Sequence, residues 1–362
     1  MTGVQTCALP IYNYKRPYYQ RVMRPRSFAG KIRYRVSRWY DQLNSNRFQG
    51  NFRDISRKQK NALISKATEL IMNNKISHVV VTGGPFHWLY YGAQLKKRFP
   101  GIKLITDFRD YWTGGEGSAM LSAEQQQSEA AKEAEVIKLA DHVTTPALKI
   151  ADYLKKIYPQ QADKIVLLAH GYDSDEIPVA SATYNQEDLI TFIYGGILYE
   201  RMEFAIRQFA ILLGNLVSKG LKVRADIYTF GTKYAEIFDA EGVTSYVNFH
   251  ETLPARDFFR KCSEADFLLQ FRAGEANEQH FRSTKFYELL VMRRYILYFG
   301  PPGEVSDFIV QNKAGFSAND GIEEMAFNIC NSKKNNSFPG EIMEISTYDF
   351  RNLTSQFVRI TE

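Results

Sequence analysis

Short apolar runs alternate with longer segments of helical periodicity along the chain from Lys58 onward. Runs such as HVVVT and LITFIY are apolar over most of their length, whereas a strand with one solvated face alternates apolar and polar residues. Strands of this kind, separated by helices, are typical of a parallel sheet that helices cover on both faces. The pattern therefore predicts an α/β fold built from doubly wound parallel sheets.

The alternation occurs twice, which predicts two domains. In the first we expect strands at 78–82, 103–108, 142–145 and 164–169, with helices at 58–74, 86–98, 123–139 and 147–157. In the second we expect strands at 189–194, 224–230, 246–250, 266–271 and 294–299, with helices at 202–218, 233–241, 254–263, 284–291, 304–311 and 346–358. Two such domains that face each other bring the carboxyl ends of both sheets to one cleft, where we expect ligands to bind.

The domain boundaries follow from the residues between the two alternations. The segment at 171–188 is rich in small and turn-forming residues, so we predict that it is the linker. The first domain then spans 12–170 and the second spans 189–345. A terminal helix at 346–362 completes the chain, and its return to the first domain is one option.

The first eleven residues, MTGVQTCALPI, fit neither a helix nor a strand. They are not a secretory signal, because the first basic residue is Lys15 and the apolar piece is short. Back-translation with gtg as the start codon reproduces the end of a widely used sequencing adapter. We therefore expect residues 1–11 to be foreign to the protein, and the natural N-terminus and first strands to lie upstream. A sheet without those strands has an unpaired edge and an exposed apolar face, so we expect this chain to be poorly soluble and inactive.

Composition limits the class of protein. A chain of 362 residues with 44% hydrophobic content can bury large cores, and no apolar run approaches the roughly 18 residues of a membrane span. Apart from Cys7, the cysteines are Cys262 and Cys330, which are too few and too far apart for a disulfide framework or a metal-binding cluster. We therefore expect a soluble or peripheral protein in a reducing, cytoplasmic setting.

Positive charge is concentrated near the start of the chain. Residues 12–60 hold fourteen Lys or Arg against Asp41 and Asp54, a local charge of +12 in a chain of net charge +6. With aromatic residues such as Phe28 and Trp39, this segment could meet anionic lipid headgroups or a phosphorylated acceptor. A solvated helix face is the alternative interpretation. No nucleic acid is expected as a partner, because no reading motif accompanies the charge.

Several sequence blocks, in matching order and spacing, resemble one enzyme family. They are VVVTGGPF and KLITDFRDYWT in the first half, and IYGGILYER, VNFHETLP, EADFLLQF and STKFYELLVMRRYILYFGPPGE in the second. Over residues 60–360 the chain resembles retaining GT-B glycosyltransferases of the glycosyltransferase 4 type, which assemble bacterial surface polysaccharides. The resemblance implies two Rossmann-like domains, a nucleotide-sugar donor, a glycan or lipid-linked acceptor, and neither a metal nor another cofactor. It also implies a cytoplasmic enzyme, with a peripheral position on the inner face of the plasma membrane as one option.

Lys285 and Glu288 in STKFYELL stand three positions apart, so they share one face of a helix near its N-terminus. Taken alone, the two residues are consistent with a surface ion pair. The resemblance implies a donor site, in which Lys285 binds the diphosphate and Glu288 accepts hydrogen bonds from ribose hydroxyls.

One position departs from the family pattern. Family members usually carry another glutamate eight residues before Glu288, and it contacts the transferred sugar. This chain has His280 there, with Glu278 and Glu275 as candidate substitutes.

Two further segments of the second half are donor-site candidates. In YGGILYER, Gly196 lets the backbone approach the ligand, and Arg201 is placed to meet the leaving diphosphate. Arg201 and Lys285 are thus the candidate catalytic cations, because they stabilise developing negative charge without a metal. A plain turn with a solvated arginine is the alternative. After the GPPG turn, the amides of Gly303 and Glu304 are candidate phosphate donors.

The resemblance also assigns an acceptor side to the first domain. Its candidate residues are Gly83, Gly84, Pro85, Asp107, Arg109 and Asp110, with Trp112 as part of the same wall. Alternation along the strand places Asp107 and Arg109 on one side, where they could pair as mere structure, so Asp110 is the better candidate for ligand contact. In the family's turn at the end of this domain, Gly171 is expected to supply a positive φ.

We therefore expect a retaining glycosyltransferase that moves a hexose or N-acetylhexosamine to a glycan acceptor, lipid-linked as one option. Two alternatives come from other classes. One is a GT-B sugar-nucleotide epimerase, and the other is a non-catalytic sugar-nucleotide binding protein, which His280 in place of the glutamate would suit.

Overall fold

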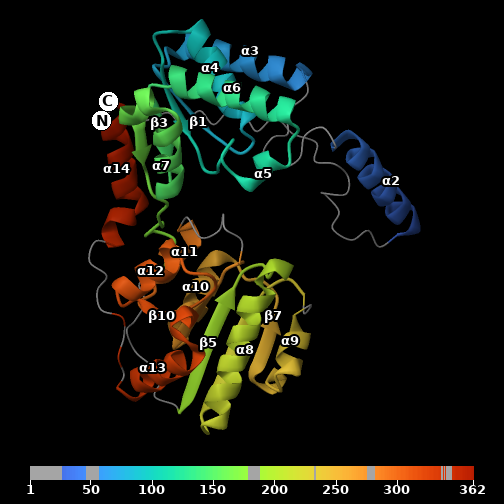
Figure 1. Ribbon diagram of the computed structural model, residues 1–362, viewed down its shortest axis with the longest axis vertical. Coiled ribbons are helices and arrows are strands. Elements are labelled where there is room, and N and C mark those ends of the chain that lie inside the picture. The colour runs from blue at the N-terminus through green and yellow to red at the C-terminus, as the bar shows by residue number, and fades with distance from the viewer. Residues whose placement is uncertain are drawn as a thin grey trace. The chain divides into compact units, whose positions relative to one another are not determined.

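The computed structural model describes residues 27–45, 57–177, 188–231, 234–274, 282–335, 337, 339 and 345–362. The chain divides into two compact units: the described parts of Met1–Thr145 with Ile150–Val166, and of Pro146–Lys149 with Leu167–Glu362. One sheet has four strands in the order β1-β2-β3-β4, and the other has six in the order β10-β9-β8-β5-β6-β7 (Figure 1). The predicted α/β class with two parallel sheets is confirmed.

The first half of the chain alternates helices with short strands. The helices are α2 (Phe28–Ser45), α3 (Arg57–Asn74), α4 (His87–Arg98), α5 (Glu116–Ala119), α6 (Ala123–Leu139) and α7 (Leu148–Ile157), and the strands are β1 (His78–Thr82), β2 (Lys103–Asp107), β3 (His142–Thr145) and β4 (Ile165–Leu167). Helix α6 begins at Ala123 because Ser122 caps it: its Oγ accepts from the amide of Gln125, whose side chain accepts from the amide of Ser122.

Strand β1 forms one edge of the first sheet within the described residues. Helix α4 lies directly on it, because a Cβ placed on Gly92 would be 2.9 Å from Cγ2 of Val81. On the opposite face of the strand, Val80 is 51% exposed. An apolar strand therefore has one covered face and one open face.

The second half repeats the alternation over a larger sheet. Its strands are β5 (Leu189–Gly195), β6 (Lys222–Tyr228), β7 (Val247–His250), β8 (Phe267–Phe271), β9 (Tyr295–Phe299) and β10 (Gly315–Ser317), and its helices are α8 (Glu203–Ser218), α9 (Ala235–Ala240), α10 (Ala255–Glu264), α11 (Thr284–Val291), α12 (Glu304–Gln311), α13 (Ile322–Lys334) and α14 (Phe350–Thr361).

Two apolar cores cover the two faces of this sheet. Phe192 of β5 packs in one core with residues of α8, α9 and α13, whereas the next residue, Ile193, packs in the other with residues of α10, α11 and α12. Successive side chains of a strand point to opposite faces, so β5 contributes to both cores. Its near-continuous apolar sequence is the consequence.

The structure corrects two predicted strands. The strand expected at 164–169 is shortened to Ile165–Leu167, because Pro159–Lys164 forms a 3₁₀ helix. The strand expected at 224–230 lies two residues earlier, at Lys222–Tyr228. Phe230 is exposed and is followed by Gly231 at a φ of 72°, so the chain turns where the pattern had extended the strand.

The carboxyl-terminal region differs more from the prediction. Strand β10 and helix α13 were not predicted, because the alternation is weak after residue 312. The last helix begins at Phe350 rather than 346, because Asp349 caps it by accepting a 2.8 Å hydrogen bond from the amide of Arg351. A 3₁₀ turn, Ile345–Tyr348, precedes this cap.

Candidate functional site

The carboxyl end of β5 carries two glycines that bring backbone to the edge of the sheet. Strand β5 ends at Gly195, and the amide of Gly196 donates to the carbonyl of Tyr228 at the end of β6, at 2.9 Å. Gly196 has a φ of 152°, which side chains rarely tolerate. Because β5, β6, β8 and β9 run in parallel, their carboxyl ends meet at this edge.

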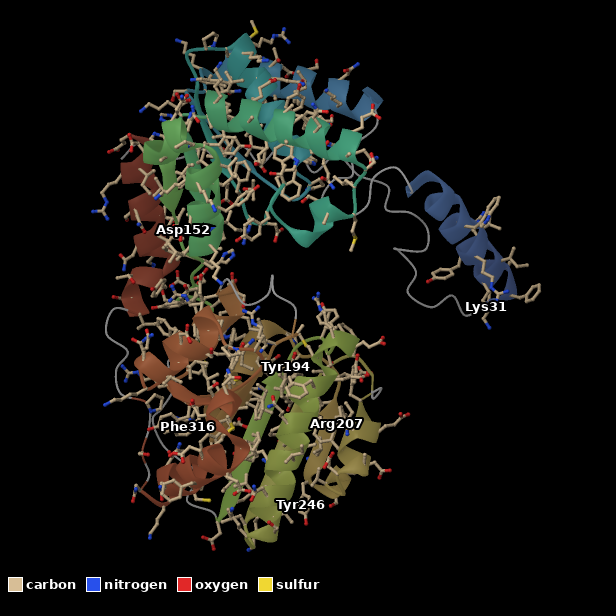
Figure 2. All side chains as sticks on the ribbon, in the orientation of Figure 1. Lys31, Asp152, Tyr194, Arg207, Tyr246 and Phe316 are labelled. Carbon is tan, nitrogen blue, oxygen red and sulfur yellow. The ribbon has the colours of Figure 1, made fainter. Side chains whose placement is uncertain are left out.

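Lys285 lies against these glycines. It is in the first turn of α11, and its Nζ donates a hydrogen bond to the carbonyl of Gly195. The same Nζ lies 4.6 Å from the centre of the Tyr194 ring, which Figure 2 places near the carboxyl end of β5. Burial lowers the pKa of the Lys285 ammonium to about 8.

Glycine at position 196 leaves space for the side chain of Lys285. A Cβ placed on Gly196 would lie 2.5 Å from Nζ of Lys285. The structure thus brings together two of the residues singled out from sequence, on elements about 90 positions apart.

Glu288 lies one turn after Lys285 on α11. Its side chain is half-buried, and burial raises the pKa of its carboxyl, against the opposing charge of Lys285. Arg201 follows β5 in the 3₁₀ turn Glu200–Met202, is exposed, and lies 5.1 Å over the ring of Tyr199. Both side chains belong to the same unit as Lys285.

Arg272 is a cation at this edge that the sequence patterns did not identify. It directly follows β8, it is buried, and its amide donates to the carbonyl of Phe299 at 2.9 Å. After burial itself, its charge contributes to the lowered pKa of Lys285. Gly300 makes room for it, because a Cβ there would be 2.7 Å from Cβ of Arg272. Its place directly after an apolar strand was the available signal.

The start of α12 is closed by hydrogen bonds of its own first turn. The amide of Gly303 donates to Oγ of Ser306, and this Oγ donates back to the carbonyl of Gly303, each at 2.9 Å. The Ser306 hydroxyl thus caps α12 through the amide and the carbonyl of Gly303, whose role as a phosphate donor stays a prediction. The carboxylate of Glu304 is 3.9 Å from Nε of Arg282, whose guanidinium lies 4.9 Å over the ring of Phe308.

The predicted acceptor-side residues lie in two loops of the first unit. The amide of Gly83 donates to the carbonyl of Asp107 at 2.8 Å, and Gly84 takes a φ of 95° before Pro85. The Asp107 carboxylate accepts from Oγ1 of Thr144 at 3.0 Å, and burial raises its pKa. The loop glycines therefore lie beside the end of β2.

Arg109 and Asp110 follow on the surface of the second loop. Both side chains are exposed. Trp112, in contrast, is not part of a surface wall: it is 1% exposed and stacks on Phe86 with ring centres 5.4 Å apart. Trp112 is therefore a core residue that packs the loop after β2 against Phe86.

The sequence patterns did not identify Glu129 of α6, whose carboxylate contacts residues near the two loops. Its carboxylate accepts from Nε1 of Trp112 at 2.8 Å and from Nζ of Lys132 at 2.6 Å, and one oxygen lies 3.0 Å from Nε2 of His87. Burial opposes its ionisation, but these hydrogen bonds outweigh that effect and lower its pKa to about 2. Glu129 is thus a buried carboxylate held by the start of α4, by the second loop and by its own helix.

Gly171 is required for a different reason from the one predicted. It does not adopt a positive φ; instead, a Cβ there would collide with the backbone carbonyl of Tyr348. The amide of Tyr172 donates to this same carbonyl at 3.0 Å. The backbone around Gly171 is therefore packed against the turn before α14.

The predicted sugar-contacting position lies outside the part of the chain that the structure describes. His280, Glu278 and Glu275 are all outside the described residues, so this contact stays a prediction.

Among the described residues, the helices are all too short or too polar to cross a membrane.

No protein-family model and no curated protein matches the sequence. Solved structures do match. A glycosyltransferase from Rickettsia africae ESF-5 gives a TM-score of 0.60 at 11% identity, over 85% of this chain and 82% of that one. A sucrose-phosphate synthase from Thermosynechococcus elongatus gives 0.58 at 10%, over 85% and 80%. A structure named as a putative UDP-N-acetylglucosamine 2-epimerase from Listeria monocytogenes gives a TM-score of 0.50 at 12% identity, over 83% of this chain and 77% of that one.

At identities of 10–12%, these likenesses show the fold. The chain has an α/β fold with two parallel sheets that matches GT-B structures. This fold occurs in glycosyltransferases and also in the epimerase of the comparison, so the chemistry of the site must decide between them.

Proposed function

We propose that the protein is a retaining glycosyltransferase that moves a hexose or N-acetylhexosamine from a nucleoside-diphosphate sugar to a glycan acceptor, lipid-linked in the cell. The observation that carries the proposal is the half-buried Lys285, whose ammonium contacts the backbone of Gly195 and lies beside Gly196. A desolvated cation at the carboxyl ends of parallel strands is suited to a diphosphate.

The roles of the cations follow from the charge that the reaction creates. Cleavage of the bond between the sugar and the diphosphate leaves a nucleoside diphosphate with added negative charge, which Lys285 and the exposed Arg201 would stabilise. Arg272 would add positive charge near Lys285. Glu288 would accept hydrogen bonds from the ribose hydroxyls. No side chain at this edge is an evident nucleophile among the described residues. We therefore propose that the acceptor oxygen bonds to the anomeric carbon on the face that the diphosphate leaves, while the bond from that carbon to the diphosphate breaks and the hydroxyl proton passes to the leaving phosphate.

The acceptor would bind the loops of the first unit. Gly84 offers exposed backbone without a side chain there, and Arg109 and Asp110 offer exposed charges that can meet hydroxyl groups. Asp107 is held by Thr144 and serves the shape of the loop.

Donor binding is the direct test. Titration calorimetry of the protein with UDP, GDP and their sugars should show binding of one nucleotide class that weakens at high salt, because charge dominates the contact. Transfer is then measured with the bound nucleotide sugar and a glycan acceptor. Absence of binding by every nucleotide would refute the proposal.

Replacement of Gly196 by alanine should weaken donor binding by at least about tenfold. The new Cβ would displace Nζ of Lys285 and would have to occupy an unfavourable φ. Gly214→Ala is the matched control, because a Cβ there meets only Val243 at 3.7 Å and alanine favours the helix. Equal donor affinities of the two variants in calorimetry would contradict this role of Gly196.

A sugar-nucleotide epimerase is the second candidate, favoured by the likeness to the Listeria structure. An epimerase changes its nucleotide sugar with no acceptor present, whereas a transferase needs one. Incubation with UDP-N-acetylglucosamine alone, followed by chromatography of the sugar, separates the two. Accumulation of an epimer would replace the transferase proposal.

A further inference from the structure

Helix α2 carries an exposed apolar stripe. Ser27 begins the helix by accepting a 3.1 Å hydrogen bond from the amide of Gly30. The apolar side chains at positions i, i+4, i+8 and i+11 are 50–80% exposed: Phe28, Ile32, Val36 and Trp39. With 3.6 residues per turn, they fall within an arc of about 80°.

The stripe is bordered by cations. Lys31 and Arg35 lie on one side of it and Arg33 on the other, by the same helical geometry. Figure 2 shows the Lys31 side chain projecting from α2. Over Phe28–Ser45 the sequence has four Lys or Arg and one acidic residue, Asp41.

We propose that α2 is a membrane-docking helix that lies in the plane of an anionic lipid surface. Its apolar stripe would enter the acyl boundary while Lys31, Arg33 and Arg35 contact lipid phosphates. The observations match the requirements of an interfacial helix: one apolar face with an aromatic residue, basic residues beside it, and low overall hydrophobicity.

The charge selects this occupant over an apolar protein surface. A second copy of the chain would bring its own Lys31, Arg33 and Arg35 against those of the first copy, and this repulsion is unfavourable. An anionic bilayer instead complements the positive charge of the helix. The inference uses none of the residues of the donor site and goes beyond the proposed reaction. Of the two interpretations of the basic segment, contact with anionic lipid headgroups and a solvated helix face, the proposal favours the first and assigns it to α2.

Vesicle flotation of the full chain tests the proposal, because aggregates do not float. Vesicles with a third of their lipid as phosphatidylglycerol should carry the protein upward, and pure phosphatidylcholine should not. The emission of Trp39 should shift to shorter wavelength on binding, a shift that Trp39→Phe removes. Absence of flotation with anionic vesicles would overturn the proposal.

Two pairs of variants separate the stripe from the charge. Ile32→Glu with Val36→Glu should abolish flotation, whereas Val310→Glu with Phe327→Glu, which alter exposed apolar residues of α12 and α13, should leave it unchanged.

Lys31→Glu with Arg35→Glu should weaken binding at least about 25-fold, since each surface cation contributes about a fivefold factor. Lys155→Glu with Lys156→Glu, at the exposed end of α7, is the charge-matched control. An equal effect of this control would show attraction by net charge alone and would overturn the assignment to α2.

Membrane docking by α2 is separable from self-association and from sugar transfer. If Ile32→Glu with Val36→Glu converts a dimer to a monomer in lipid-free buffer, the stripe is a contact between copies and the proposal is wrong. Lys285→Ala should float as the unaltered protein does, so loss of transfer and loss of docking are separate results.

Discussion

Replacement of Lys285 by alanine should lower the turnover number for sugar transfer at least about 1,000-fold. The substitution removes a desolvated positive charge where the leaving diphosphate gains negative charge, and loss of one such group costs about 10²–10³ even in milder cases. Donor affinity should fall less than turnover, because Arg201 and Arg272 remain. Transfer assays at varied donor concentration, with a glycan acceptor present, give both values.

The pH dependence gives an independent signature of this lysine. Its pKa is lowered to about 8, so kcat/KM for the donor should decline as the pH rises through about 8 and the ammonium loses its proton. Bound diphosphate favours the charged form, so the decline in kcat should occur at higher pH. Lys285→Arg should move the decline in kcat/KM to much higher pH, because guanidinium keeps its charge.

The control for Lys285 is a lysine of the same unit with no expected role. Lys261 is on α10, and its Nζ pairs with Glu264 at 2.6 Å near the surface. Lys261→Ala should keep near-normal turnover. Undiminished transfer by Lys285→Ala would remove Lys285 from the mechanism.

Replacement of Glu129 by alanine should lower the free energy of unfolding by about 3–5 kcal/mol. It leaves three donors, on His87, Trp112 and Lys132, without their shared acceptor in a buried site, and breaking such a network is costly. Denaturation by urea measures the change. Glu124→Ala, in the exposed first turn of the same helix, should cost less than about 1 kcal/mol.

The contribution of Glu129 to the free energy of unfolding should also depend on pH between about 2 and 4.5. Its pKa is about 2 in the folded protein and about 4.5 when unfolded, so the unfolded chain binds more protons between these values. The contribution of Glu129 is therefore complete above pH 4.5 and is lost as the pH falls toward 2. A Glu129→Ala variant with the same acid sensitivity as the unaltered protein would contradict this account.

Much of the fold was predictable because its strands are buried on both faces. Runs such as LITFIY have only one interpretation when helices flank them, and β5 lies where the pattern placed it, apart from one residue at its end. The prediction failed where the apolar signal was short: β10 has three residues, and α13 follows it with mixed composition.

The candidate site was partly predictable for a similar reason. Gly196 and Lys285 stand at motif positions, and the structure brings them together, while their roles in donor binding stay predictions. Glu129 and Arg272 could not be found in the same way, because a charged residue in a helix or after a strand is usually solvated. Only the packed structure shows that Glu129 is 3% exposed and Arg272 is 8% exposed.

The close approach of Gly300 to Arg272 has a consequence for evolution. Gly300 does not take a positive φ, so a larger residue at this position would be excluded by neighbouring atoms rather than by the backbone conformation. Those neighbours are Cβ of Arg272 and the hydroxyl of Tyr298, 2.7 Å and 3.0 Å from a Cβ at position 300. The two strand ends therefore cannot drift independently. Related sequences should gain bulk at position 300 only where position 272 has lost it, and this covariation would mark lineages that have rebuilt the cationic edge.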